Sequence, residues 1–194
     1  MNEVKIRILK PLPKKKVLIS ACLLGINCKY NGGNNRNKLL IKLVENGYII
    51  PVPVCPEQLG GLSTPRPQAE IQNYDRVFDQ MKVKNIDELF VEKYFYKGSD
   101  ETVKMAAICD VSNCIMKEGS PSCGVDFIYD GTFSNKKIEG SGITSLALKK
   151  NGFHTISSDR FILNPGRVAG LFDEIPDTDN VDMHIEKKGG FVIE

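Results

Sequence analysis

Val17-Leu-Ile-Ser-Ala-Cys-Leu-Leu-Gly25 joins a short aliphatic run to a polar loop, which continues through Ile26-Asn-Cys-Lys-Tyr-Asn-Gly-Gly33. An aliphatic, β-branched run bounded by lysine before it and turn residues after it is typical of a buried strand. Cys22 therefore lies at the predicted carboxyl end of that strand. Open α/β sheets bind their ligands at this end, so the stretch predicts a fold class and the place of a functional site.

Two later stretches repeat this arrangement of an apolar run followed by a cysteine. Val52-Pro-Val-Cys-Pro-Glu57 follows Tyr48-Ile-Ile50, and Gly119-Ser-Pro-Ser-Cys-Gly124 follows Ile115-Met116. The carboxyl ends of parallel strands meet at the same edge of a sheet. We therefore expect the three cysteines to converge on one site.

Helical and strand patterns alternate along most of the chain, which indicates an α/β fold with a parallel sheet. A helical pattern from Ile86 to about Ile108 is interrupted near Gly98-Ser-Asp100, where Ser99 or Asp100 is a candidate cap for a second helix. Gln58 to Pro67 has the composition of a structured loop. The other predicted elements are helices at 38–47 and 143–151, a fourth parallel strand at 153–156, a hairpin of 69–71 with 76–84, a turn with short strands at 128–133, and a short strand at 4–9.

The pattern weakens from Arg160 onward, where prolines and acidic residues are frequent. We predict an α/β domain at residues 1–159 and an appendage of unknown role at 160–194. A chain of 194 residues is long enough for one such domain with its own core.

Charge and hydropathy limit the class of partner. The 26 basic and 24 acidic residues leave a net charge of +2, which is not the footprint of a dedicated nucleic-acid binder. No segment has the roughly 18 consecutive apolar residues of a membrane span, and no secretory signal precedes the first strand. We expect a cytoplasmic protein with a small-molecule substrate and no membrane association. A nucleic-acid partner is disfavoured but not excluded.

The chain has six cysteines and no Cys-x-x-Cys pair, which disfavours a zinc ribbon and a thioredoxin-type motif. Thiolates that arrive from separate loops bind soft metal centres, and iron–sulfur clusters require sulfur ligands. Three cysteine ligands would leave one iron of a four-iron cluster open, as a Lewis acid or as a site for the sulfur of a thiocarbonyl group.

Each cysteine has a simpler explanation, because free cysteine is often a small buried hydrophobe. We prefer that explanation for Cys109 and Cys114, which lie at a predicted helix end and strand start. Cys28 is undecided between packing and an auxiliary role. The neighbours of the other three cysteines are serine, proline and glutamate, which are unusual in a core. The predicted metal ligands are Cys22, Cys55 and Cys123.

Glu57 stands two residues after Cys55, close enough to face the same site. It is a candidate proton carrier, and an exposed loop glutamate is an equally good interpretation. Ser120 and Ser122 carry hydroxyl groups suited to binding a substrate or water. Serines next to proline and glycine also form ordinary turns, and taken alone these two favour the turn.

Several motifs, taken in order, resemble the thiouracil desulfidase family, long catalogued only as a domain of unknown function. They are Ser20-Ala-Cys-Leu-Leu-Gly25, Cys28-Lys-Tyr-Asn-Gly32, Pro53-Val-Cys-Pro-Glu-Gln-Leu-Gly-Gly-Leu62, Ser63-Thr-Pro-Arg-Pro-Gln-Ala-Glu-Ile71 and Ser120-Pro-Ser-Cys-Gly124. The resemblance extends from about Lys15 to Ser158. It implies a Rossmann-like parallel sheet with helices on both faces and a [4Fe–4S] cluster at the strand carboxyl ends, held by the three predicted ligands.

The resemblance also implies a non-redox reaction, in which the open iron takes the sulfur of a thiolated pyrimidine such as 2-thiouracil and water replaces it, giving uracil and sulfide. Glu57 and Ser120 occupy the catalytic positions, and we expect Arg66 and Ser122 to bind the substrate. Lys29 departs from the family, which commonly has arginine there.

Three other hypotheses stay open. The first is a desulfidase that acts on a thiolated nucleoside or on tRNA. The second is a non-catalytic iron–sulfur or sulfide-handling protein. The third is an ordinary α/β binding domain whose cysteines belong to the core.

Overall fold

The computed structural model describes residues 15–72, 81–163, 185–186 and 190–191. The strand predicted at 4–9 and the start of the hairpin strand at 76–84 lie outside these residues. The chain divides into two compact units, residues 1–163 and 164–194. In the second unit, β9 (Ile185–Glu186) pairs antiparallel with β10 (Gly190–Phe191). The role of this unit stays an open question.

The first unit is built on a four-stranded parallel sheet, which confirms the predicted fold class. Its strands, in the order β2-β1-β5-β8, are β2 (Ile49–Val54), β1 (Lys15–Ser20), β5 (Asn113–Met116) and β8 (His154–Ser157). Leu18 of β1 lies opposite Val52 of β2 and Cys114 of β5. The chain leaves β1 toward one edge and β5 toward the other, so the topological switch point lies between these two strands.

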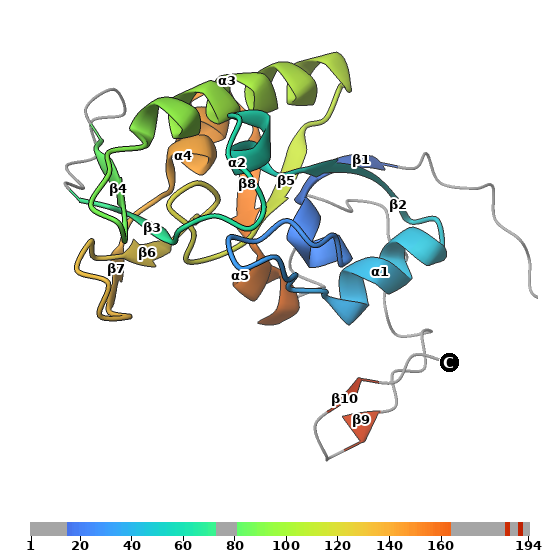
Figure 1. Cartoon of the computed structure of the whole chain (residues 1–194). Helices are drawn as coiled ribbons and strands as arrows, with labels where there is room; N and C mark the ends of the chain where they lie inside the picture. Colours follow the sequence, from blue (N-terminus) through green and yellow to red (C-terminus); the bar gives the residue numbers. More distant parts are fainter. Residues whose placement is uncertain (1–14, 73–80, 164–184, 187–189, 192–194) are drawn as a thin grey trace, which may run out of the picture. The chain divides into compact units, whose positions relative to one another are not determined.

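Helices cover both faces of this sheet (Figure 1), as predicted. On one side lie α2 (Pro56–Leu59), α3 (Glu92–Ile108) and α4 (Ile143–Lys150), and on the other lie α1 (Lys38–Glu45) and α5 (Ser158–Leu163). Leu18 and Met116 of the sheet pack with Ala106 of α3 and Leu148 of α4, and all four are buried. Burial of this apolar surface stabilises the layers.

The break predicted near Gly98 is wrong, because α3 runs without interruption from Glu92 to Ile108. It also begins six residues later than the helical pattern that starts at Ile86. Gly98 serves close packing: a Cβ atom there would lie 1.8 Å from the carbonyl oxygen of Pro56 in α2. The same holds for Gly60, just after α2, where an added Cβ atom would lie 1.9 Å from the backbone oxygen of Tyr94 in α3. The glycines let two helix backbones touch.

Short elements complete the unit. A 3₁₀ helix, η1 (Ala21–Leu24), follows β1, and α2 replaces the start of the predicted loop at 58–67. The antiparallel pair of β3 (Ala69–Ile71) with β4 (Val83–Asn85) agrees with the predicted hairpin. A second pair joins β6 (Phe127–Tyr129) to β7 (Lys137–Glu139), and its turn is longer than predicted, because β7 lies beyond the predicted range of 128–133.

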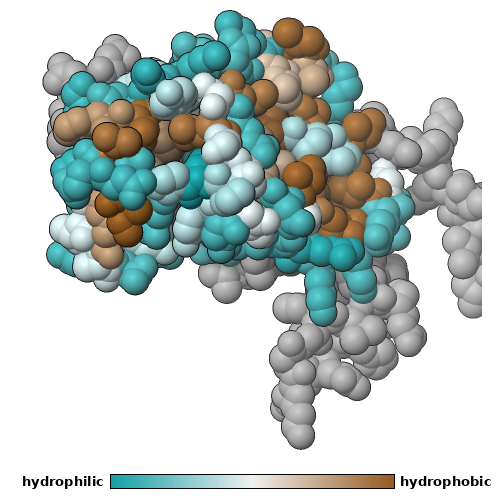
Figure 2. Space-filling view, in the orientation of Figure 1, coloured by the Kyte–Doolittle hydropathy of each residue, from teal (hydrophilic) through white to brown (hydrophobic). Residues whose placement is uncertain are grey.

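Hydrophobic and hydrophilic side chains interleave over the face shown in Figure 2. In the part of the chain that the structure describes, no helix has the length and apolar character needed to cross a membrane.

Candidate functional site

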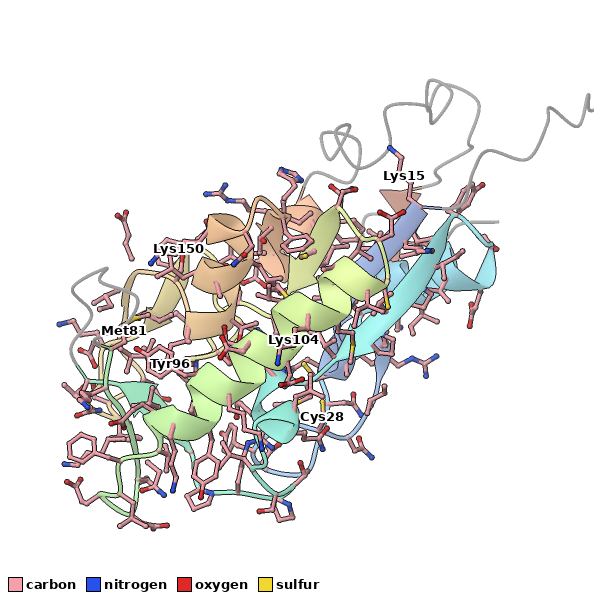
Figure 3. The ribbon with its side chains drawn as sticks, turned by 90° about the horizontal axis from the view of Figure 1, so that it is seen from above. Lys15, Cys28, Met81, Tyr96, Lys104 and Lys150 are labelled. Carbon is pink, nitrogen blue, oxygen red and sulfur yellow. The ribbon has the colours of Figure 1, made fainter. Side chains whose placement is uncertain are left out.

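The three predicted ligands lie on one cavity of about 290 Å³ at the carboxyl ends of β1, β2 and β5. Cys22 belongs to η1 directly after β1, Cys55 follows β2 as the residue that precedes α2, and Cys123 lies in the loop after β5. Cys28, labelled in Figure 3, lines the same cavity from the loop after η1. The convergence predicted from three strand ends is therefore observed, at the switch point of the sheet.

Hydrogen bonds hold the loops around Cys22 in place. The backbone N–H of Lys117, just after β5, donates to Ser20 Oγ at 3.0 Å and ties the ends of β1 and β5 together. Gly25 ends η1 with φ of 89°, a left-handed conformation that suits glycine. Asn35 donates its backbone N–H to the oxygen of Cys22 at 2.9 Å, and its side-chain amide approaches Cys22 Sγ at 3.8 Å.

Cys28 sets the protonation of its two neighbours. A hydrogen bond from the Cys28 thiol lowers the pKa of Cys22, and the same interaction lowers the pKa of Cys55 to about 7. In return, the bonds to Cys22 and Cys55 raise the pKa of Cys28 well above its ordinary value. Burial raises the pKa of the Cys123 thiol. Metals bind the thiolate and not the thiol, so the lowered pKa values of Cys22 and Cys55 favour the form in which these two residues can bind a metal.

The other two cysteines lie away from the cavity, among apolar side chains. Cys114 is fully buried in the centre of the sheet, and burial raises its pKa to about 12. Cys109 ends α3 and packs against the same hydrophobic cluster. Both have the surroundings of packed thiols.

The donor set fits an iron–sulfur cluster better than a single ion. Among the described residues, no three His, Cys, Asp or Glu side chains are grouped closely enough to hold one metal ion. A [4Fe–4S] cluster binds each cysteine through a different iron, so its ligands stand further apart than those of one ion. Cys22, Cys55 and Cys123 face one cavity from three separate elements, and all three are the sulfur donors that iron–sulfur clusters require.

Glu57 lines the cavity from the first turn of α2 and is held by an ion pair. Arg66 Nε lies 2.7 Å from Glu57 Oε2, and the two side chains are 5% and 15% exposed respectively. A charge-assisted hydrogen bond in such a dry environment fixes the carboxylate firmly. The remaining N–H groups of Arg66 face the oxygen of Ser63, the hydroxyl of Thr64, the oxygen of Cys28 and, at 4.0 Å, the sulfur of Cys55.

Ser120 connects Glu57 to the loop that carries Cys123. Its hydroxyl donates to Glu57 Oε1 at 3.4 Å and accepts the backbone N–H groups of Ser122 and Cys123, each at 3.1 Å. The catalytic pair expected from the sequence is thus brought together on the cavity wall. Ser120 both orients the carboxylate and shapes the loop of a predicted ligand.

Ser122 is not brought to the cavity. Its side chain is fully buried, and its hydroxyl lies 2.9 Å from the hydroxyl of Thr144 in α4. Because Ser122 is not among the residues that line the cavity, the structure does not support its expected role in substrate binding. Ser122 instead joins the Cys123 loop to the start of α4.

Glu118 is a site residue that the sequence analysis missed. It lines the cavity and is only 5% exposed. Buried carboxylates require partners, and here the partners are backbone N–H groups of the loop that surrounds Cys123. Glu118 accepts from Gly119, Val125, Asp126 and Phe127 at 2.9–3.3 Å. The sequence feature that could have identified Glu118 is its position directly after a predicted strand and before Gly119.

Glu70 is a second buried carboxylate that accepts backbone N–H groups, here from the turn between β6 and β7. This carboxylate is 1% exposed and accepts the backbone N–H groups of Gly131 and Phe133, each at 3.0 Å. It also receives the side-chain amide of Gln68, which lines the cavity, at 3.3 Å. Glu70 thereby fixes the amide of Gln68 with its nitrogen toward the carboxylate.

Known proteins share these motifs and this fold. The model of a family described as 2-thiouracil desulfurase matches residues 17–160. The uncharacterized protein YbbK of Bacillus subtilis (strain 168) is 42% identical over 146 residues, which cover 74% of this chain and 95% of that protein. The solved structure of a [4Fe–4S]-dependent thiouracil desulfidase, TudS, is similar with a TM-score of 0.69 and 32% identity, over 80% of this chain and 99% of that one. The chain belongs to the 2-thiouracil desulfurase family.

Proposed function

We propose that this protein is a [4Fe–4S]-dependent desulfidase that converts a small thiolated pyrimidine, such as 2-thiouracil, to uracil and hydrosulfide with water as the second substrate. The observation that carries the proposal is the meeting of Cys22, Cys55, Cys123 and Glu57 on one cavity at the switch point of the sheet. Family membership and the similarity to TudS support the same reaction.

Cys22, Cys55 and Cys123 would hold the cluster, and Cys28 would stay outside the ligand set. When bound, the cluster supplies an iron without a protein ligand, a Lewis acid with affinity for a soft sulfur atom. The bonds to Cys22 and Cys55 raise the pKa of Cys28, and this direction agrees with an auxiliary group.

Glu57 would move the protons. The overall reaction exchanges a C=S bond for a C=O bond: water supplies the oxygen to carbon, and its protons leave with the sulfur or enter the solvent. No electron is gained or lost, so no reductant is needed. Glu57 Oε1 takes a proton from the attacking water, and Ser120 holds that oxygen through its hydroxyl at 3.4 Å. Arg66 keeps the other carboxylate oxygen in place at 2.7 Å.

Arg66 acts through its neighbours in this proposal. A guanidinium group has five N–H donors, and its contacts here are with protein groups. Binding of the pyrimidine ring falls to other cavity residues with polar or aromatic side chains, among which are Gln68 and Tyr129.

The charge of the chain favours a free base over RNA. A volume of about 290 Å³ lies at the lower end of the range for small-ligand pockets. RNA-binding proteins attract phosphates with basic surfaces, whereas this chain carries a net charge of only +2. A thiolated nucleoside or tRNA stays the second candidate substrate.

Anaerobic reconstitution followed by incubation with 2-thiouracil, 4-thiouracil and thiolated tRNA tests the proposal. We expect iron and acid-labile sulfide in the protein, and sulfide release from a free thiolated base faster than from tRNA. Release from tRNA alone would favour the second candidate. An iron-loaded protein that releases no sulfide would indicate a non-catalytic iron–sulfur or sulfide-handling protein. A protein that binds no iron would indicate a plain α/β binding domain.

A further inference from the structure

Lys117 is a cation at the switch point that the proposed chemistry has not used. It is the first residue after β5, and it lines the cavity. Its backbone N–H is bonded to Ser20 Oγ, two residues before Cys22. Lys117 is therefore anchored at the meeting point of the two central strands, next to the first predicted ligand.

The ammonium group of Lys117 is held in place without being neutralised. Its Nζ donates to the backbone oxygen of Glu118 at 2.7 Å. Within the described residues, no ion pair joins Lys117 to a carboxylate. The Glu118 carboxylate itself accepts backbone N–H groups instead. An ammonium group has three N–H donors, and the bond to the oxygen of Glu118 uses one of them.

The other cavity cations are less suited to binding an anion. Arg66 is paired with Glu57, and its further N–H groups contact protein oxygens. Lys29 lines the cavity from the loop after η1 and not from a strand end.

We infer that Lys117 donates a hydrogen bond to the hydrosulfide formed from the thiolated base, and so stabilises the charge that develops on the sulfur in this cavity. This inference rests on the proposed function, which begins with a neutral base and water and ends with uracil, a hydrosulfide anion and one released proton. The sulfur gains that charge as the C–S bond breaks. A fixed ammonium group at this point stabilises the leaving sulfur and requires little reorganisation.

The test measures hydrosulfide binding to the cluster-loaded protein by anaerobic titration, followed by the change in visible absorption, with no turnover. Hydrogen bonds to charged groups are strong enough that their loss weakens binding by about 10- to 100-fold. We expect that change in the dissociation constant for Lys117→Gln, and less than about 3-fold for Lys117→Arg, which keeps the charge. Lys104→Gln, at an exposed lysine paired with Glu101, is the control and should match the wild type.

Three results would overturn the inference. The Lys117→Gln variant could bind hydrosulfide as tightly as the wild type. It could lose its iron, which would mean that Lys117 serves cluster assembly. Lys29→Gln could weaken hydrosulfide binding equally, which would mean that the anion responds to the total charge of the cavity and not to one group.

The inference and the proposed function fail in different ways. A wild-type protein that binds hydrosulfide through Lys117 but releases none from thiolated bases would refute the function and keep the anion site. A protein that releases sulfide from thiolated bases, but whose hydrosulfide binding is unchanged in Lys117→Gln, would support the function and refute the role of Lys117.

Discussion

Arg66 and Glu57 form a nearly buried ion pair, with Nε 2.7 Å from Oε2, on the wall of the cavity that the three predicted ligands share. The pair joins two parts of the chain that the sequence separates, the start of α2 and the loop before β3. It holds the carboxylate where a second contact, from Ser120, also reaches it. The proposed proton carrier is therefore positioned before any substrate binds.

Removal of Arg66 should destabilise the protein. In Arg66→Met, a nearly buried carboxylate loses its partner, and breaking a buried pair in this way typically costs about 3–5 kcal/mol of unfolding free energy. The double variant Arg66→Met/Glu57→Gln should lose clearly less than the sum of the two single variants, because it leaves no unpaired charge. Urea unfolding of the anaerobic protein measures all three values. Strictly additive losses would show that the pair contributes no coupling.

Substitution of Glu57 should separate turnover from cluster binding. General acid–base groups contribute about 10²- to 10⁴-fold to a rate, so we expect Glu57→Gln to lower sulfide release by a factor in that range. Glutamine keeps the size of the side chain, and Glu57 is not a predicted ligand, so the iron-to-protein ratio should not change. Turnover at the wild-type rate would remove Glu57 from the proposed chemistry.

Ser120→Ala provides the comparison for Glu57. It removes a bond to the carboxylate and also the acceptor for the N–H groups of Ser122 and Cys123. We expect a smaller loss of turnover than in Glu57→Gln, together with some loss of iron as the Cys123 loop loosens. A defect as large as that of Glu57→Gln at full iron content would mean that the two residues act as one unit.

The cysteines should fall into two groups when iron content is measured after anaerobic reconstitution. Alanine at Cys22, Cys55 or Cys123 should abolish cluster binding, because three-cysteine ligation has no replacement. Cys28→Ala and Cys109→Ala should keep their iron, since neither belongs to the predicted ligand set. A Cys28→Ala protein without iron would make Cys28 a fourth ligand and would contradict the open iron in the proposed function.

Gly98→Ala tests the close approach of α2 and α3. Alanine in a helix free of contacts is favoured over glycine by about 1 kcal/mol, but here the added Cβ atom would lie 1.8 Å from the oxygen of Pro56. Overpacking of this kind costs about 1–3 kcal/mol, and the shift of α2 should also displace Glu57. We expect lower stability and lower turnover, with Lys97→Ala at an exposed position of the same helix as the control. A gain in stability would contradict the packing.

The sequence predicted the sheet and the convergence of the cysteines for a simple physical reason. Aliphatic runs that are buried on both faces are read easily as parallel strands, and the residues after them must gather at one edge. The helix break predicted at Gly98 was wrong, because the sequence does not distinguish a glycine that permits two backbones to touch from a glycine that ends a helix. Local periodicity contains no information about the oxygen of Pro56, which lies far away in the sequence.

The wall of the site was harder to predict than its ligands. Glu118 and Lys117 are ordinary charged residues in sequence, and only the fold shows that Glu118 accepts backbone N–H groups while Lys117 is tied to Ser20. For Ser122 the sequence misled in the other direction. Its position beside a predicted ligand suggested that it faces the cavity, but its hydroxyl is bonded to that of Thr144. Neighbours in sequence point to opposite sides of a loop, and spacing does not say which.

The central claim is a hydrolytic desulfidation without redox chemistry, and one measurement tests it directly. The cluster-loaded wild-type protein is incubated anaerobically with 2-thiouracil in ¹⁸O-labelled water, without a reductant, and uracil and sulfide are quantified together. We predict equal amounts of uracil and sulfide, with one atom of labelled oxygen in each uracil. No release of sulfide, a requirement for added reductant, or uracil without the label would contradict the account.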